Sequence, residues 1–182
     1  MSAQDQKIVQ RIPLPWAVTL TVIFSLPFGL LLGNFNFTLW VCFIVWAQYF
    51  MLGAKPFTWK IVFPSFAVGA ATAALWMATS NLVNGTLGSH PLVGLIVGTV
   101  IWVTALLYWM PHSKTLTTGT LSVFNGLAMF LGVYFTGSGP KLVTDPYMVI
   151  IVAFVWTTLM GYFGWFLGWL DIVLTFPKVE NK

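Results

Sequence analysis

Few side chains in this sequence could support acid–base or metal chemistry. The 182 residues include four Asp or Glu and two His, and two of the acids lie close to the chain ends. The other two, Asp145 and Asp171, would be ~39 Å apart along one helix at its usual rise per residue. His90 and His112 flank opposite ends of an apolar run, so no cluster of metal ligands forms. No phosphate-binding loop is present, and we expect neither an enzyme nor a bound cofactor.

The neutral polar side chains inside apolar runs are the better candidates for function. Asn125 is predicted near the middle of one such run, and Gln48 nearer the inner end of another. A buried amide needs partners, so both should face protein or water. Two interpretations stay open: hydrogen bonds between helices, or a lining that guides a small solute. The candidate residues for a pore or solute path are Asn125, Gln48, Ser122, Thr99, Trp46 and Trp102.

The ionisable residues add little to such a path. The deep positions of the apolar runs are neutral, and Asp171 is predicted near the inner surface. Proton-coupled transporters usually keep an ionisable residue inside the membrane. The sequence therefore disfavours coupling to protons. Cys42 lies inside an apolar run as the single cysteine, which predicts a small buried hydrophobe rather than a disulfide or a thiolate metal site.

The elements that must position these residues follow from the composition. The chain is 58% hydrophobic and 17% aromatic but only 7% charged, with a mean hydropathy of +0.88. Soluble domains carry about 25% charged residues. The composition excludes an ordinary soluble enzyme, a disordered chain and a basic nucleic-acid binder. We therefore expect a membrane protein with the lipid bilayer as its first partner and no nucleic-acid partner.

Residues 1–182 are interpreted as a single transmembrane domain, an all-α polytopic helix bundle with six transmembrane helices. About 20 apolar residues cross a bilayer as a helix. The segment at 37–53 is short for a crossing, and the polar stretch at 115–120 could be re-entrant or unwound. The predicted spans are 14–32, 37–53, 61–79, 91–110, 115–135 and 146–174.

Orientation follows from the distribution of positive charge. With the N-terminus in the cytoplasm, seven of the eight Lys and Arg residues face inward, and the outer loops hold only Lys141. Both termini are then cytoplasmic. The first apolar run lacks a small-residue cleavage site, so it is interpreted as an uncleaved span. The inward residues are Lys7, Arg11, Lys55, Lys60, Lys114, Lys178 and Lys182.

An internal similarity suggests that the bundle is built from repeated helix hairpins. The Tyr-aromatic-Met pattern at 49–51, followed by Lys55, recurs at 108–110, followed by Lys114. Parallel repeats are common in transport proteins. Pairs of glycines four residues apart also predict close helix packing, either within the bundle or against partners outside the chain. These pairs are Gly29 with Gly33, Gly94 with Gly98, and Gly164 with Gly168.

The order of aromatic and small residues after the first span resembles a known family. Trp40-Val-Cys-Phe is followed by Tyr49-Phe50, a Lys-bearing loop, Phe63-Pro-Ser-Phe-Ala-Val-Gly and Trp76. This order is similar to that of the YcdZ-like family of small bacterial inner-membrane proteins, and the stretch at 137–147 also looks alike. The resemblance implies a multi-pass protein in the bacterial inner (plasma) membrane. It implies no activity and no functional residues.

Two functions from different classes fit these observations. The first is a channel or facilitator for a small solute, with a neutral polar solute favoured, a small anion possible, and a homo-oligomer expected. The second is a structural or accessory subunit of a membrane complex, whose glycine and alanine stripes face partners outside the chain. A membrane-embedded enzyme ranks last because acid–base residues are scarce.

Overall fold

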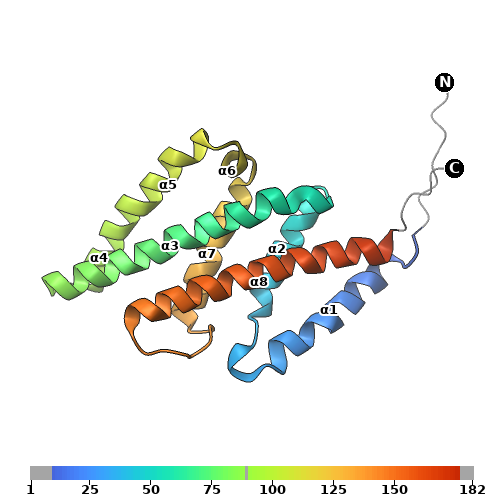
Figure 1. The fold of residues 1–182 in the computed structure, drawn as a ribbon, viewed down its shortest axis with the longest axis horizontal. Coiled ribbons are helices and arrows are strands. Elements are labelled where there is room, and N and C mark those ends of the chain that lie inside the picture. Colours follow the sequence, from blue (N-terminus) through green and yellow to red (C-terminus); the bar gives the residue numbers. More distant parts are fainter. Residues whose placement is uncertain (1–9, 89, 177–182) are drawn as a thin grey trace.

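The computed structural model describes residues 10–88 and 90–176, and every regular element in this part of the chain is helical (Figure 1). The predicted all-α fold class is therefore confirmed. A π-helical turn at Thr99–Val103 joins α4 to α5. The α-helices are α1 (Leu14–Leu30), α2 (Leu39–Met51), α3 (Trp59–Leu87), α4 (Pro91–Gly98), α5 (Thr104–Trp109), α6 (Lys114–Thr118), α7 (Thr120–Thr136) and α8 (Pro146–Thr175).

Three helical stretches are long and apolar enough to cross a membrane. They are Pro56–Leu87, Pro91–His112 and Pro146–Thr175. The other helices are shorter: α1 and α7 have 17 residues each, and α2 has 13. At 1.5 Å per residue they span about 26 Å and about 20 Å, against about 30 Å of hydrocarbon. The structure supports a membrane protein, and six crossings stay a prediction.

The bundle has two layers with an arm on one side (Figure 1). The long helices α3 and α8 lie beside each other, and α2 and α7 cross behind them. The arm formed by α4, the π-helical turn and α5 packs against α3 through α4 and the π-helical turn, whereas α1 packs against α8. Helices α1, α2, α4, α6 and α7 each meet a long helix, so α3 and α8 organise the bundle.

The backbones of α3 and α7 are in direct contact through glycines. A Cβ atom on Gly69 would lie 1.8 Å from the carbonyl oxygen of Val123, and one on Gly126 would lie 2.0 Å from that of Phe66. In lipid, such small residues let helices approach closely enough for extensive van der Waals contact. This contact fixes the position of α7.

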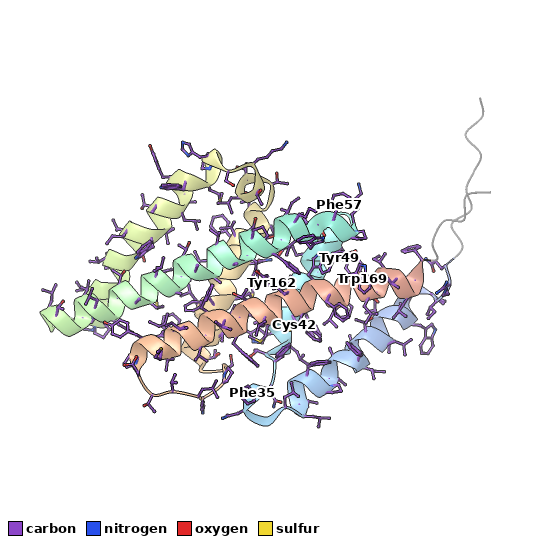
Figure 2. All side chains as sticks on the ribbon, in the orientation of Figure 1. Phe35, Cys42, Tyr49, Phe57, Tyr162 and Trp169 are labelled. Carbon is purple, nitrogen blue, oxygen red and sulfur yellow. The ribbon has the colours of Figure 1, made fainter. Side chains whose placement is uncertain are left out.

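Most of the predicted glycine pairs also pack inside the chain. Gly94 and Gly98 face α3, where an added Cβ would meet the Ser80 carbonyl oxygen and Trp76. Gly164 meets the backbone of Cys42, which is buried where α2 crosses α8 (Figure 2). The prediction of close packing is confirmed for these positions, and their contacts lie within the chain.

The first glycine pair behaves differently from the others. Gly29 lies against the Leu39 side chain, but Gly33 has nothing within 4 Å of an added Cβ and a φ of +59°. Gly33 therefore serves the turn after α1, where its left-handed backbone favours glycine. The packing prediction was wrong at this residue.

The end predicted for the third span was also wrong. The third span is predicted to end at residue 79, but α3 continues to Leu87 and stops where Gly88 adopts a φ of +54°. The Asn84 Oδ1 atom accepts a hydrogen bond from the Gly94 backbone N–H at 3.1 Å, which holds this extension against α4. Hydropathy marks where the apolar residues end, and here the helix extends beyond them.

The polar stretch at 115–120 forms a broken helix. The short α6 ends at Thr118, and Gly119 separates it from α7, which starts at Thr120. An added Cβ on Gly119 would lie 2.2 Å from the Ser65 Oγ atom of α3. The fifth predicted span is therefore helical but interrupted, at a point where the chain approaches α3 closely.

The two halves of the proposed sequence repeat lie in different environments. Tyr49 is fully buried and donates a hydrogen bond to the Ala54 carbonyl oxygen. Its counterpart Tyr108 is 71% exposed. The hairpin repeat stays a prediction, and these two tyrosines do not play equivalent roles in packing.

Candidate functional site

Two clusters of polar side chains lie on different sides of α2. Trp46 and Gln48 are two residues apart, which places them about 200° apart around a helix of 3.6 residues per turn. Gln48 meets α7, and Trp46 lies beside Asp171 of α8. We call Gln48, Ser122 and Asn125 the amide cluster. We call Thr21, Trp46, Asp171 and Thr175 the carboxyl cluster.

The amide cluster joins α2 to α7 by hydrogen bonds. The Gln48 side chain donates through Nε2 to the Ser122 Oγ atom. Its Oε1 atom accepts from the Asn125 Nδ2 atom at 2.8 Å. Gln48 and Ser122 are buried, whereas Asn125 is partly exposed. The structure thus brings together three of the six residues predicted for a solute path.

The sequence positions this cluster through helical spacing. Ser122 and Asn125 are three residues apart and therefore share a face of α7. Within the described residues, the Asn125 Oδ1 atom accepts no hydrogen bond, and it is not among the fully buried unpaired atoms. This amide oxygen is the part of the cluster that could accept a hydrogen bond from a small polar molecule.

Thr99 and Trp102 belong to a different helix contact. Both lie in the π-helical turn, which packs against α3. The Trp102 indole donates to the Thr79 Oγ1 atom at 2.7 Å. The Thr99 hydroxyl donates to the Leu95 carbonyl oxygen of its own helix at 2.8 Å. Trp102 therefore bonds to α3, and Thr99 bonds within the arm. The amide cluster, by contrast, lies between α2 and α7.

The carboxyl cluster holds a buried acid that the sequence analysis missed. Asp171 is 0% exposed. Its Oδ1 atom accepts a hydrogen bond from the Thr21 hydroxyl of α1 at 3.2 Å. The sequence predicts this residue near the inner surface but not its burial, which depends on α1 packing over α8. The available signal was an acid within the apolar run that ends α8, since such residues usually have a function.

Several buried polar atoms of this cluster have no partner among the described residues. They are the Asp171 Oδ2 atom, the Trp46 Nε1 atom and the Thr175 Oγ1 atom. The Trp46 indole lies beside the Asp171 carboxyl group, but the two make no hydrogen bond of normal geometry. Thr157 Oγ1 is also unpaired but lies elsewhere on α8. Buried unpaired polar atoms are uncommon and call for an explanation such as a water, an ion or a proton.

The remaining acids and bases form no second site in the described part of the chain. Asp145 caps α8, because its Oδ1 atom accepts from the backbone N–H groups of Tyr147 and Met148 at 3.0 and 2.9 Å. Residues 10–88 and 90–176 contain no group of three or more His, Cys, Asp or Glu side chains that could hold a metal ion.

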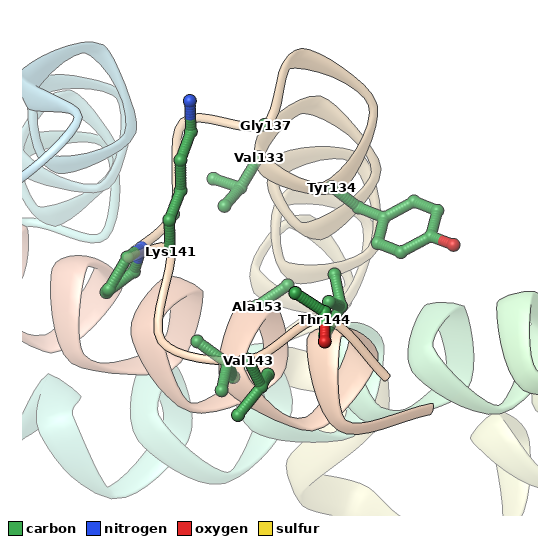
Figure 3. A pocket seen from close by; sticks show the side chains of 11 residues that line it. Val133, Tyr134, Gly137, Lys141, Val143, Thr144 and Ala153 are labelled. Carbon is green, nitrogen blue, oxygen red and sulfur yellow. The ribbon is translucent and has the colours of Figure 1, made fainter. Parts of the chain in front are cut away.

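Two cavities lie away from both clusters. One, of about 280 Å³, lies between the end of α7, the loop that follows it and the start of α8. Figure 3 shows the Lys141 amine directed away from Val143 and Ala153, so the cavity has an apolar floor. The other is a groove of about 360 Å³ between α3 and α8, lined by side chains that include Ala74 and Phe154.

Comparison with known proteins finds one family. A family model described as "Protein of unknown function (DUF1097)" matches residues 17–169. No curated protein matches the chain, and no solved structure does. The matched range includes the whole amide cluster, whereas Asp171 and Thr175 lie just beyond its end.

Proposed function

The chain belongs to the DUF1097 family of proteins of unknown function, and from this premise we propose that it is a channel or facilitator for a small solute. The solute is a neutral polar molecule such as urea or a short amide. The observation that carries the proposal is the amide cluster, in which the partly exposed Asn125 keeps an amide oxygen free of hydrogen bonds within the described residues.

The chemistry of the cluster favours a neutral solute over an anion. Its polar groups are two amides and one hydroxyl, without a charged side chain. An amide oxygen accepts a hydrogen bond from an N–H or O–H group, so urea or a short amide can donate to Asn125. Anion pores are lined by Arg or Lys, and the small anion is the less favoured solute.

We further propose that the chain crosses the membrane six times with both ends in the cytoplasm. Figure 1 supports this arrangement, since the turn after α1 and the loop before α8 lie along one edge and the turns after α2 and α5 along the other. Within the described residues, Lys55 and Lys114 adjoin the second pair of turns, and Lys141 lies in the loop before α8. Lys7, Lys178 and Lys182 lie outside the described residues.

Cysteine labelling tests this topology. Cysteines placed at Asn34, Asn84 and Ser138 should react with an impermeant reagent added outside, and cysteines at Ala54 and Ser113 should not. The natural Cys42 is buried, so background labelling should be low. Labelling of the Ala54 position from outside would refute six crossings. Asn181, the third expected inner position, lies outside the described residues.

Solute entry into liposomes tests the function itself. Purified protein in liposomes should accelerate the entry of urea, formamide or acetamide relative to protein-free liposomes, as measured by light scattering after rapid mixing. Chloride serves as the anion in the same panel. If the protein accelerated the entry of chloride but not the entry of urea or the amides, the solute would be an anion instead of a neutral molecule. No acceleration of any solute would contradict a channel or facilitator.

The alternative is a structural or accessory subunit of a membrane complex. The apolar groove between α3 and α8 favours it, because Ala71, Ala74 and Ala78 leave room there for another helix. The glycine pairs favour it less, since they are occupied by contacts within the chain. If the chain alone gave no flux and flux appeared only when a partner protein was present, this second function would be supported.

Location and closer kinship are also proposals. We place the protein in the bacterial inner membrane as a homo-oligomer, among the YcdZ-like proteins. The resemblance in the order Trp40, Tyr49, Phe50 and Trp76 supports that location. Exposed apolar residues on many helices, such as Ile44 of α2 and Phe124 of α7, support contact with lipid or with a second copy.

A further inference from the structure

We propose that Asp171 is a proton-binding site, and that its protonation acts through α2 on the amide cluster, so that solute movement depends on pH. The proposal deepens the facilitator function and rests on it. It reverses the sequence-based expectation that coupling to protons is disfavoured.

The Asp171 carboxyl group is buried without a counter-charge. Asp171 is 0% exposed and forms no ion pair within the described residues. Its single hydrogen bond comes from the neutral Thr21 hydroxyl. An ionised carboxylate taken out of water without a cation is costly. A carboxyl group avoids that cost by binding a proton, which is why acids within membranes commonly serve as proton relays.

The titratable groups on the packed elements offer no cation to this carboxyl group. Helix α1 has no titratable side chain, and α2 has Cys42 and Tyr49. The Tyr49 hydroxyl is already bonded to the Ala54 carbonyl oxygen. On α8 itself, the Tyr162 hydroxyl donates to the Phe63 carbonyl oxygen at 3.1 Å.

The basic residues near this end of the bundle form no ion pair with Asp171 in the described part of the chain. The Arg11 backbone N–H donates to the Thr175 carbonyl oxygen at 2.8 Å, and Arg11 is exposed. The amines of Lys55 and Lys60 lie over the rings of Phe57 and Trp59.

The unpaired polar atoms of the carboxyl cluster permit two hydrogen-bonding states of Asp171. When Asp171 is ionised, its Oδ2 atom can accept from the Trp46 indole N–H. When Oδ2 carries a proton, it becomes a donor, and the Thr175 hydroxyl four residues along α8 can accept from it. The step is the reversible transfer of one proton between water and Oδ2, with no other bond changed. The Trp46 indole N–H therefore has an acceptor when Asp171 is ionised and loses it when Oδ2 is protonated.

The position of Asp171 allows the proton to arrive from the inner side. The residue lies four positions before the last residue of α8, or ~6 Å along the helix axis. Thr175 is that last residue. The bound proton therefore comes from cytoplasmic water in the proposed topology.

Helix α2 links the carboxyl cluster to the amide cluster. Trp46 faces the carboxyl cluster, and Gln48, two residues later, holds the amide cluster together. Helix α2 contacts α8 closely, since an added Cβ on Gly168 would lie 2.7 Å from the Tyr49 ring. A change in the Trp46 contact can thus move the segment that carries Gln48. By linkage, if protonation alters solute binding, solute alters proton binding by the same factor.

The test combines infrared titration with flux, using the full chain in liposomes. Titration should reveal a protonated carboxyl band that Asp171→Asn removes. Urea entry in the wild type should change about fivefold or more across the neutral range, the lower end of typical couplings, and should lose this dependence in Asp171→Asn. The matched control is Asp145→Asn, the same chemical change at an exposed cap where Asn is equally suitable, and it should behave as the wild type.

A second variant keeps the carboxyl group in case Asp171→Asn does not fold. Thr21→Val removes the hydroxyl that donates to Asp171. Because the ionised carboxylate loses a donor, the midpoint of the band should shift to higher pH. An unchanged midpoint would overturn the assignment of the band to this cluster.

The outcomes separate this inference from the proposed function. Urea entry that is independent of pH, without an Asp171 band, would overturn the proton site and leave the facilitator intact. An Asp171 band without flux of any solute would support proton binding and overturn the facilitator, and the coupling with it. Flux that requires Na⁺ instead of responding to pH, and that Asp171→Asn abolishes, would overturn the proton as the bound cation.

Discussion

The two polar clusters beside α2 differ in how far their fully buried polar atoms are paired. In the amide cluster, Gln48 bonds to two partners on α7 through both polar atoms of its side chain. In the carboxyl cluster, buried donor and acceptor atoms lie together unpaired within the described residues. Paired buried groups hold helices in register, whereas unpaired groups are ready to bind a proton or a ligand. Gln48 and Ser122 are therefore structural polar groups, whereas the unbonded Asn125 oxygen and the unpaired atoms of the carboxyl cluster are the candidate functional ones.

The helices that carry the two clusters also differ in how firmly they are packed. Helix α7 is fixed to α3 by contact of the two backbones at Gly69 and Gly126. Helix α1 meets α8 through buried small side chains, Ala17, Thr21 and Ser25, and exposes much of its other surface. We therefore expect α1 to be the more mobile of the two, which suits a site that changes its hydrogen bonds.

The largest effect is expected where α7 is fixed. In Gly126→Ala the new Cβ would lie 2.0 Å from the Phe66 carbonyl oxygen, so the helices must separate, at a cost of about 3 kcal/mol or more in unfolding free energy. Gly85→Ala is the control, because nothing lies within 4 Å of its added Cβ. It should be neutral or stabilising by up to about 1 kcal/mol. Equal stability of the two variants in detergent unfolding would refute the α3–α7 contact.

A smaller loss is expected from Gln48→Leu. This change leaves Ser122 and Asn125 without their shared partner, at a cost of about 1–2 kcal/mol. Thr72→Val is the control, since that buried hydroxyl bonds to the Val68 carbonyl oxygen of its own helix and its loss should cost little. If both variants unfold as the wild type does, the amide cluster does not stabilise the bundle.

The smallest effect is expected in the carboxyl cluster. Thr175→Val replaces a hydroxyl whose oxygen has no partner within the described residues. At a pH where Asp171 is ionised no bond is lost, so stability should rise or fall by less than about 1 kcal/mol. The same unfolding assay would measure it beside Ser122→Ala, which removes the acceptor of Gln48. A larger loss for Thr175→Val than for Ser122→Ala would reverse the comparison.

The sequence predicted the fold class and several helix starts for clear physical reasons. Pro91 and Pro146 each occupy the first turn of their helix, where a missing N–H costs nothing. The end of α3 was missed because polar residues continue that helix beyond its apolar part. Helices α1 and α2 are shorter than their predicted spans because turns occupy the rest, whereas α7 is shorter because the separate helix α6 precedes it.

The candidate site was predicted in part. Amides within apolar runs need partners, so Gln48 and Asn125 were identifiable individually, and their mutual hydrogen bond is a tertiary fact. Trp46 was identified as a path residue but lies in the carboxyl cluster. The burial of Asp171 depends on which face of α8 is covered by α1, and hydropathy carries no information about that choice.

Flux per folded molecule in Asn125→Leu tests the central claim most directly. The variant loses its bond to Gln48, so it should be less stable by about 0.6–1.7 kcal/mol. Its urea entry rate, divided by the folded protein in the same liposomes, should fall about tenfold, as for one lost hydrogen bond of about 1.4 kcal/mol. Thr120→Val, which removes a hydroxyl that donates to the Thr117 carbonyl oxygen of the neighbouring α6, should leave that rate unchanged. An unchanged rate per folded molecule in Asn125→Leu would contradict a solute path at the amide cluster.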